Sequence, residues 1–240
     1  VLGLPAVAGP EPLGLALPRS RCPHCGHPIG ALENIPVLSW LWLRGRCRTC
    51  QAPISVRYPL VELGSAVLSA WTAWHFGPGW PLLAFLVLGW ALLALALIDL
   101  DCQLLPDDLV LPLLWLGLVL NGCGLLQVPL ADALWGAVAG YLGLWSVYWL
   151  FRLLTGKEGM GYGDFKLLAL LGAWGGWQIL PLTLLLSALV GAVVGTLVLR
   201  LKRQGLDTPI PFGPFLIGAG WIALLWGDQM TARYLQLAGF

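Results

Sequence analysis

Charged side chains are scarce in this sequence: Asp, Glu, Lys and Arg make up only 10% of its 240 residues, against 58% hydrophobic residues. A soluble domain of average composition carries about 25% charged residues, so this chain has too little charge to cover a surface exposed to water. Its net charge of +1 provides no basic excess, which excludes nucleic acid as the expected partner. Both deficits predict an integral membrane protein in contact with lipid.

Histidine is scarce as well, and this limits the hydrolytic mechanisms open to the chain. Of the three histidines, His24 and His27 lie in a cysteine-rich segment and His75 lies in an apolar run. Hydrolases of the Ser–His and Cys–His types would therefore lack a base beside the carboxylates of the chain. The pattern H-E-x-x-H is also missing, which excludes the usual zinc protease. A pair of carboxylates is the catalytic device that remains.

Apolar runs of membrane-spanning length recur from Leu60 onward. We expect helices over residues 60–76, 81–98, 108–126, 132–151, 165–180, 182–200 and 211–227. Each run is close to the ~17–25 residues that a bilayer crossing needs. Because backbone groups in hydrocarbon must pair within the segment, these runs are helices rather than open strands.

The basic residues indicate the orientation. If residues 1–59 face the cytoplasm and each run crosses once, all 13 Lys and Arg residues except Arg233 lie on the cytoplasmic side. The opposite orientation places the same residues on the wrong face. The sequence therefore predicts an all-α polytopic membrane protein with about seven transmembrane helices and a cytoplasmic N-terminal region.

Four of the six cysteines form two C-x-x-C pairs with 21 residues between them, Cys22 with Cys25 and Cys47 with Cys50. This is close to the usual spacing of a four-cysteine zinc site, and four thiolates make such a site closed and structural. Two disulfides are the alternative, but the predicted cytosolic side keeps thiols reduced. We predict a cytoplasmic zinc-binding domain over 1–58 and a transmembrane protease domain over 59–240.

Carboxylates crowd the joint between the second and third expected helices, and no Lys or Arg lies in that joint to pair with them. They are Asp99, Asp101, Asp107 and Asp108, and Asp164 begins the fifth helix on the same side of the membrane. A charge at the bilayer centre costs at least ~2.5–3.5 kcal/mol, so such acids need a reason. Asp107 or Asp108 can cap the helix after Pro106, and Asp164 can be an N-cap with Lys166 as its partner. Asp99 has no such alternative, because it closes an apolar helix.

Two close aspartates cannot both ionise and therefore share one proton. Asp99 and Asp164 in that arrangement predict a general acid–base pair that hydrolyses peptide bonds. A transporter that relays ions through membrane carboxylates is the runner-up, but it favours midplane acids and two matching halves, which the sequence does not show.

Small residues recur at four-residue spacing in Gly136/Gly140, Gly172/Gly176 and Gly191/Gly195. One interpretation is close helix–helix contact within the bundle. The alternative is chance, because the chain contains 31 glycines.

Several of these motifs resemble one known family. Gly161-Tyr162-Gly163-Asp164 is similar to the GxGD motif of intramembrane aspartic proteases, and Ile98-Asp99 through Leu105-Pro106-Asp107 resembles its partner motif in type IV prepilin peptidases. The cysteine pairs and the segments 33–36, 57–62 and 209–214 resemble that family in the same order. The resemblance runs from about Arg21 to the C-terminus.

The resemblance implies an aspartic endopeptidase of the bacterial inner membrane, with Asp99 and Asp164 as the catalytic pair. Its substrates are type IV prepilins and type II secretion pseudopilins, which lose a basic leader after a glycine on the cytoplasmic side. Many members then N-methylate the new terminus with S-adenosylmethionine, and Gly45 matches a glycine linked to methylation. Methylation rests on the resemblance alone, because the sequence has no recognisable cofactor fingerprint.

Two further expectations concern the start of the chain and a proline-rich segment. Because the chain begins abruptly at Val1 without an initiator Met, we expect a fragment or an incompletely ordered chain, and the further spanning helix with which typical members of the family begin is a departure here. The segment 209–214 either holds unwound backbone near the substrate or is an ordinary proline-rich helix entry.

Overall fold

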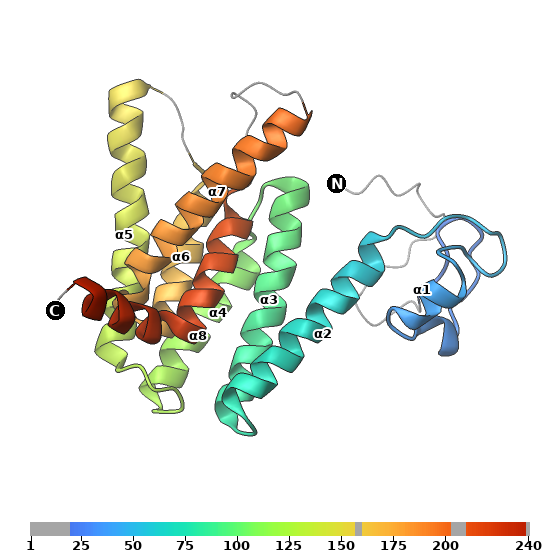
Figure 1. Cartoon of the computed structure of the whole chain (residues 1–240), viewed down its shortest axis with the longest axis horizontal. Helices are drawn as coiled ribbons and strands as arrows, with labels where there is room; N and C mark the ends of the chain where they lie inside the picture. The colour runs from blue at the N-terminus through green and yellow to red at the C-terminus, as the bar shows by residue number, and fades with distance from the viewer. Residues whose placement is uncertain (1–19, 157–159, 203–209, 239–240) are drawn as a thin grey trace. The chain divides into compact units, whose positions relative to one another are not determined.

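The computed structural model describes residues 20–156, 160–202 and 210–238, and these residues fold almost entirely into helices (Figure 1). The elements are η1 (Leu32–Asn34), α1 (Leu38–Trp42), α2 (Arg57–Phe76), α3 (Trp80–Cys102), α4 (Asp107–Gly122), α5 (Leu130–Thr155), α6 (Tyr162–Gly175), η2 (Trp177–Ile179), α7 (Leu180–Lys202) and α8 (Gly213–Ala238). Each expected apolar run overlaps one helix from α2 to α8, so the all-α prediction is confirmed for the described residues.

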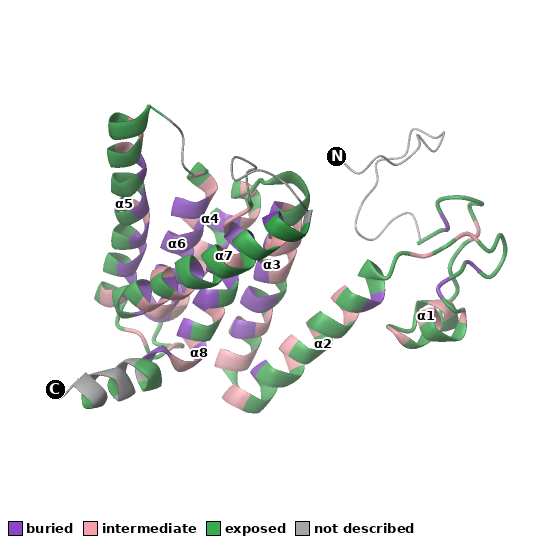
Figure 2. Ribbon diagram, turned by 45° about the horizontal axis from the view of Figure 1, so that its top comes forward, coloured by how far each residue is buried: buried purple, intermediate pink, exposed green. Residues whose placement is uncertain are grey.

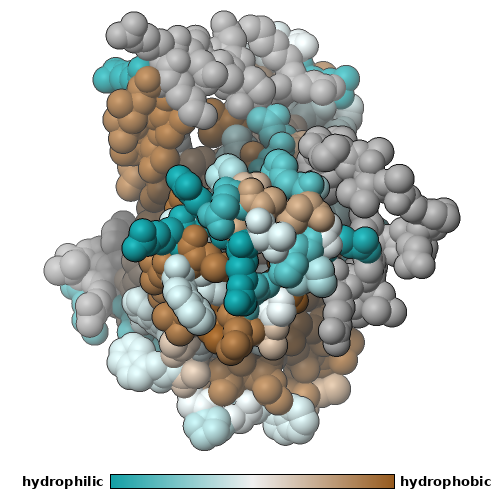
Figure 3. Space-filling model, turned by 90° about the vertical axis from the view of Figure 1, so that its right-hand side faces the viewer, coloured by the Kyte–Doolittle hydropathy of each residue, from teal (hydrophilic) through white to brown (hydrophobic). Residues whose placement is uncertain are grey.

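The chain divides within α2 into two compact units, one ending at Trp71 and the other beginning at Thr72. We call them the cysteine-rich unit and the helical unit. The domain boundary expected at residues 58 and 59 lies near the start of the same helix. In the view of Figure 3, hydrophilic side chains gather near the middle of the face toward the viewer. Within the cysteine-rich unit, Arg44, Arg46 and Arg48 are exposed.

Three helical segments are long and apolar enough to cross a membrane, among the residues that the structure describes. They are Trp80–Cys102, Leu130–Thr155 and Trp177–Leu201, and Gly213–Gly227 is a shorter apolar helix. Many of their large apolar side chains are exposed, as Leu83 and Trp90 on α3 and Leu185 and Leu189 on α7 illustrate. Such outward faces suit contact with lipid. The count of seven crossings is not confirmed.

Helix α6 is the centre of the helical unit, and Figure 2 shows its ribbon coloured as buried along nearly its whole length. It contacts α4, α5 and α8. Residues 164–165 and 167–174 are all buried, so the helix is apolar on every side rather than along one stripe. A helix apolar all round lies inside a protein, and neighbouring helices rather than lipid surround the 14 residues of α6.

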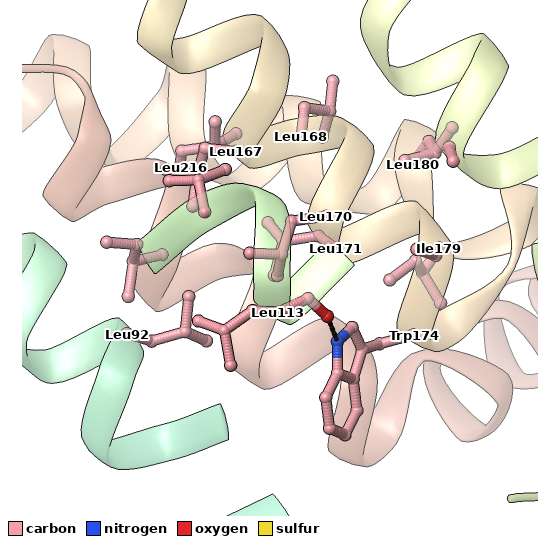
Figure 4. Packing of buried hydrophobic residues seen from close by; sticks show 14 of the residues in the cluster. Leu92, Leu113, Leu167, Leu168, Leu170, Leu171, Trp174, Ile179, Leu180 and Leu216 are labelled. Atoms are coloured by element: carbon pink, nitrogen blue, oxygen red, sulfur yellow. Dashed lines mark hydrogen bonds between the residues drawn. The ribbon is translucent and has the colours of Figure 1, made fainter. Parts of the chain in front are cut away.

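The core of the helical unit forms where α3, α4 and α8 close on α6. Figure 4 shows Leu92, Leu113, Leu171 and Leu216 converging with Trp174, and all five are buried. The Trp174 indole donates from Nε1 to the carbonyl oxygen of Leu113 over 2.9 Å. Its ring lies against Gly117 of α4, where a Cβ would stand 2.5 Å from Cδ1.

The small-residue interpretation is confirmed for the contact between α5 and α6. A Cβ on Gly136 would strike the carbonyl of Gly172, and one on Gly140 would lie 2.7 Å from the carbonyl oxygen of Leu168. Gly176 lies in the same contact, since its carbonyl carbon would stand 2.7 Å from a Cβ on Gly136, and it also ends α6 with φ +78°. Gly191 and Gly195 face side chains next to or within α8 at 3.4 and 3.0 Å, which is a looser contact.

Candidate active site and metal centre

A cavity of about 530 Å³ opens in the helical unit where α3 ends and α6 and α8 begin. Asp99 comes from the last turn of α3, and Asp164 from the first turn of α6. Both carboxylates line this cavity although 65 positions separate them in the sequence. Its remaining walls come from segments that flank the helices and from the start of α6. The flanking segments contribute Leu104, Leu105, Met160, Gly161, Pro211 and Phe212 among others, and α6 contributes Tyr162, Gly163 and Lys166.

Asp99 is buried, with only 5% of its surface exposed. Helix α3 ends after it at Gln103, which has φ +54° and donates its N–H to the Asp99 carbonyl over 2.9 Å. The backbone N–H of Gly213, at the start of α8, interacts with the Asp99 carboxyl group. Its Oδ2 atom has no hydrogen-bond partner among the described residues. A buried oxygen without a partner is rare and points to function.

Asp164 is 7% exposed and is held by the chain just before it. Its backbone N–H donates to the Gly161 carbonyl over 3.3 Å. Gly163 lies against Leu105, where a Cβ would stand 2.9 Å from the Leu105 Cβ, so the two motif segments touch. Asp99 and Asp164 are close enough to interact electrostatically. Two buried acids in this arrangement can share a proton.

The neighbouring charges differ from the expected pairing. The Nζ atom of Lys166 lies 2.7 Å from both carboxylate oxygens of Asp107, which it neutralises across α4 and α6. The N-caps of these helices are Pro106 and Gly161, without side-chain cap hydrogen bonds. The capping interpretations of Asp107, Asp108 and Asp164 were therefore wrong, because these acids lie one to three residues inside the first turn.

The cysteine-rich unit brings together Cys22, Cys25, Cys47 and Cys50. All four Sγ atoms lie within 4.8 Å of one another, with 3.8 Å between Cys22 and Cys50 and 4.0 Å between Cys25 and Cys47. Four thiolates at ~2.3 Å around a tetrahedral zinc ion are about 3.8 Å apart. The donor set and its spacing therefore fit a metal ion of this kind.

Each cysteine pair lies on its own backbone turn, and the two turns have the same hydrogen-bond pattern. The Cys22 N–H donates to the His27 carbonyl and the Gly26 N–H to the Cys22 carbonyl, both over 2.9 Å. Cys47 repeats the pattern, donating to Ala52 over 2.9 Å and accepting from Gln51 over 3.0 Å. The turn needs a positive φ at its fifth residue, which is Gly26 at +70° and Gln51 at +58°. The second turn is therefore strained where the first is not.

The four thiols lose their protons with unequal ease. Backbone N–H groups of Cys25 and His24 lower the pKa of Cys22 to about 7. Although the His27 N–H lowers it, desolvation and the neighbouring thiols raise the pKa of Cys25 to about 12. The cluster cannot ionise fully unaided, and a bound divalent cation would supply the missing charge.

Glu33 joins the two turns without entering the thiol cluster. Its carboxylate lies 3.4 Å from His27 Nε2, beside the first turn, and 3.4 Å from Arg48 Nη1, within the second. The Gly30 N–H and these two side chains lower the pKa of Glu33 against the opposing effect of burial. His27 is thus a partner of Glu33 rather than a metal ligand, and His24 is exposed.

A second cavity, of about 650 Å³, lies within the cysteine-rich unit. Trp40, Tyr58, Glu33 and Glu62 line it. The Glu62 carboxylate accepts the Val37 N–H over 2.7 Å, and the Trp40 indole donates to the Ile54 carbonyl over 3.1 Å. Sequence reasoning singled out the cysteine pairs and the segments 33–36 and 57–62 but missed this cavity, because nothing in the sequence shows that these segments meet around one space.

Gly45 does not line this cavity but lies directly behind its Trp40 wall. It has φ +68°, and a Cβ there would stand 2.9 Å from Cζ2 of Trp40. Its carbonyl accepts the Ile54 N–H over 2.7 Å. The geometry makes Gly45 a support for Trp40 rather than a direct contact of a ligand.

Two family models match the chain, the bacterial peptidase A24 N-terminal domain over residues 4–76 and the type IV leader peptidase family over residues 86–196. A prepilin leader peptidase/N-methyltransferase of Stutzerimonas stutzeri is 66% identical, over 99% of this chain and 82% of that protein. A protein of the same name from Pseudomonas aeruginosa is 65% identical, over 96% of this chain and 81% of that protein. The Aeromonas hydrophila protein of that name is 66% identical, with coverage of 93% and 77%. No solved structure matches the chain significantly.

Proposed function

The chain belongs to the type IV leader peptidase family and acts as a prepilin leader peptidase/N-methyltransferase, and we propose that Asp99 and Asp164 are its catalytic pair. One observation carries this assignment: two buried carboxylates, from helices far apart in the sequence, line one cavity and interact electrostatically. No Lys or Arg among the described residues forms an ion pair with either acid. A shared proton therefore remains available for catalysis.

The pair hydrolyses the peptide bond by exchanging protons. The ionised aspartate takes a proton from water as the water oxygen attacks the scissile carbonyl, and the protonated aspartate polarises the carbonyl oxygen. When the C–N bond breaks, the leaving amine takes a proton from the pair, which restores one protonated and one ionised carboxyl group. Titration belongs to the pair rather than to either residue.

The three apolar segments of spanning length and the family fit a membrane protein. We place it in the bacterial inner membrane with seven crossings, α2 to α8, and with its cysteine-rich unit and carboxylate pair on the cytoplasmic side. The basic residues support this orientation. Substrates are type IV prepilins and type II secretion pseudopilins, whose basic leaders lie in the cytoplasm while the following apolar helix lies in the membrane.

The four cysteines could hold a metal ion, and we assign it as structural zinc. S-adenosylmethionine would supply an electrophilic methyl group on its sulfonium for the second activity. The cavity beside the cysteine turns has a volume suited to such a ligand. Trp40 and Tyr58 offer aromatic faces for a purine or a sulfonium, and Glu62 offers negative charge. Gly45 contributes by keeping Trp40 in place.

Single replacement of Asp99 and Asp164 by Asn tests the peptidase assignment in membranes that contain a prepilin precursor. Asn keeps the shape but cannot exchange the proton, so both variants should lose leader removal. Asp108→Asn is the matched control, because Asp108 is exposed and does not line the cavity. Full cleavage by either Asp99→Asn or Asp164→Asn overturns the pair. Methylation of a pilin that already lacks its leader should survive both changes.

A further inference from the structure

The carboxyl group of Asp99 presses on a residue that has no side chain. A Cβ built on Gly213 would stand 2.5 Å from Oδ2, 3.0 Å from Cγ and 3.5 Å from Cβ of Asp99. These three atoms are the nearest that it would meet. Among the described residues, the atoms that an alanine Cβ at 213 would meet first therefore all belong to the Asp99 side chain.

The first turn of α8 leaves one N–H group for Asp99. Pro214 has no N–H, and the N–H groups of Phe215 and Leu216 both donate to the Phe212 carbonyl over 3.1 Å. The Gly213 N–H faces the Asp99 carboxyl group instead. It lies at the positive end of a helix of 26 residues. The order Phe-Gly-Pro thus directs one donor at a buried acid whose Oδ2 has no partner.

We propose that Gly213 is the positioning residue of Asp99: its missing side chain admits the carboxylate at the start of α8, in the cavity that Asp164 also lines. This inference rests on the proposed role of Asp99. It gives the segment 209–214 a function at its described end, residues 210–214, because Pro211 and Phe212 line the same cavity.

Alanine at 213 should leave the fold intact and move the carboxylate. The atom nearest to the new Cβ is Oδ2 of Asp99, at the tip of a short side chain that can rotate. A Cβ on Gly136 would instead meet backbone atoms of Gly172, which cannot move aside by rotation. A misplacement of about 1 Å in a catalytic group can cost about 100-fold in rate. Gly218→Ala is the matched control on α8, since a Cβ there meets nothing within 4 Å.

The test measures leader removal, its pH profile and thermal unfolding in the full chain. Gly213→Ala should lower kcat by about 100-fold with little change in KM. It should also displace the pH–rate profile, whereas a smaller fraction of folded protein would lower the rate equally at every pH. Gly218→Ala should behave as the unmodified chain. Methylation of a pre-cleaved pilin should stay within twofold in both variants.

A double-mutant cycle separates positioning from packing. Gly213→Ala should lower the unfolding temperature of the unmodified chain but not of Asp99→Ala, in which the displaced atoms are gone. An equal shift in both backgrounds overturns the inference. So does a Gly213→Ala variant with unchanged kcat and pH profile while Asp99→Asn is inactive. Activity in Asp99→Asn would instead overturn the proposed function itself.

Discussion

Gly45 and Gly26 offer a comparison that isolates one contact. Both lie in the cysteine-rich unit and have positive φ, +68° for Gly45, which precedes the second cysteine turn, and +70° for Gly26, which belongs to the first. A Cβ on Gly45 would stand 2.9 Å from the Trp40 ring, whereas a Cβ on Gly26 would meet nothing within 4 Å. Alanine therefore brings the same backbone strain at both positions, and a displaced Trp40 at one of them.

The expected magnitudes follow from these two terms. A left-handed conformation costs an alanine about 1–2 kcal/mol, so Gly26→Ala should destabilise the unit by that amount. Gly45→Ala adds an overpacking cost of about 1–3 kcal/mol. Gly45→Ala also moves the Trp40 wall of the cavity, so the methylation rate should fall at least about tenfold more than in Gly26→Ala. A tenfold difference in rate corresponds to about 1.4 kcal/mol of activation free energy.

The assay follows methylation of a pre-cleaved pilin with labelled S-adenosylmethionine, beside leader removal and resistance of the bound metal to a chelator. Leader removal should stay within twofold in both variants, because the proposed catalytic pair, Asp99 and Asp164, lies in the helical unit. Equal methylation in Gly45→Ala and Gly26→Ala would refute the Trp40 contact as the reason. Trp40→Phe should retain more activity than Gly45→Ala, since it keeps an aromatic wall and loses the indole donor to Ile54.

Two other predictions concern the helix contact and the metal. Gly136→Ala should destabilise the helical unit by about 1–3 kcal/mol, because its Cβ meets the Gly172 backbone. Gly143→Ala on the same helix, where a Cβ meets nothing within 4 Å, should be neutral or stabilise the unit by up to about 1 kcal/mol. Thermal unfolding in detergent compares the two variants, and equal losses of stability would contradict the close contact. The purified chain should carry about one zinc ion, measured by atomic absorption. Cys50→Ser should lose the zinc ion, whereas Cys123→Ser, which lies outside the cluster, should keep it. Retention of zinc in Cys50→Ser would exclude the site.

Local sequence patterns predicted the helices well because each is encoded by its own run of apolar residues. The bounds moved by a few residues where capping decides them: α4 begins at Asp107 after Pro106, and α5 continues to Thr155, where Gly156 takes a left-handed turn. The short helix α1 was not predicted, because five residues are too few to show a period. The central place of α6 was also missed, since an apolar run does not say whether lipid or protein surrounds it.

The site divides in the same way between local and distant information. Asp99, Asp164 and the four cysteines stand in recognisable motifs, so sequence alone singled them out. Gly213, Trp40 and the pairing of Lys166 with Asp107 depend on contacts between segments far apart in the chain. The glycine in Pro211-Phe212-Gly213-Pro214 did carry a signal, because a residue without a side chain in a proline-rich segment allows another group to approach the backbone closely. The sequence does not show which group approaches it.

The walls of the carboxylate cavity explain how water can reach a bond beside a membrane. Residues 103–106 follow α3, residues 160–161 precede α6 and residues 210–212 precede α8, and all three segments are outside helices. Their backbone groups are not all paired as they would be inside a helix, and unpaired groups cannot face hydrocarbon. They can face a polar cavity. Three helix ends that meet around two acids therefore create the wet pocket that hydrolysis requires, in a helical unit whose outer face suits lipid. The buried Oδ2 of Asp99 without a partner is the place where we expect the attacking water to bind.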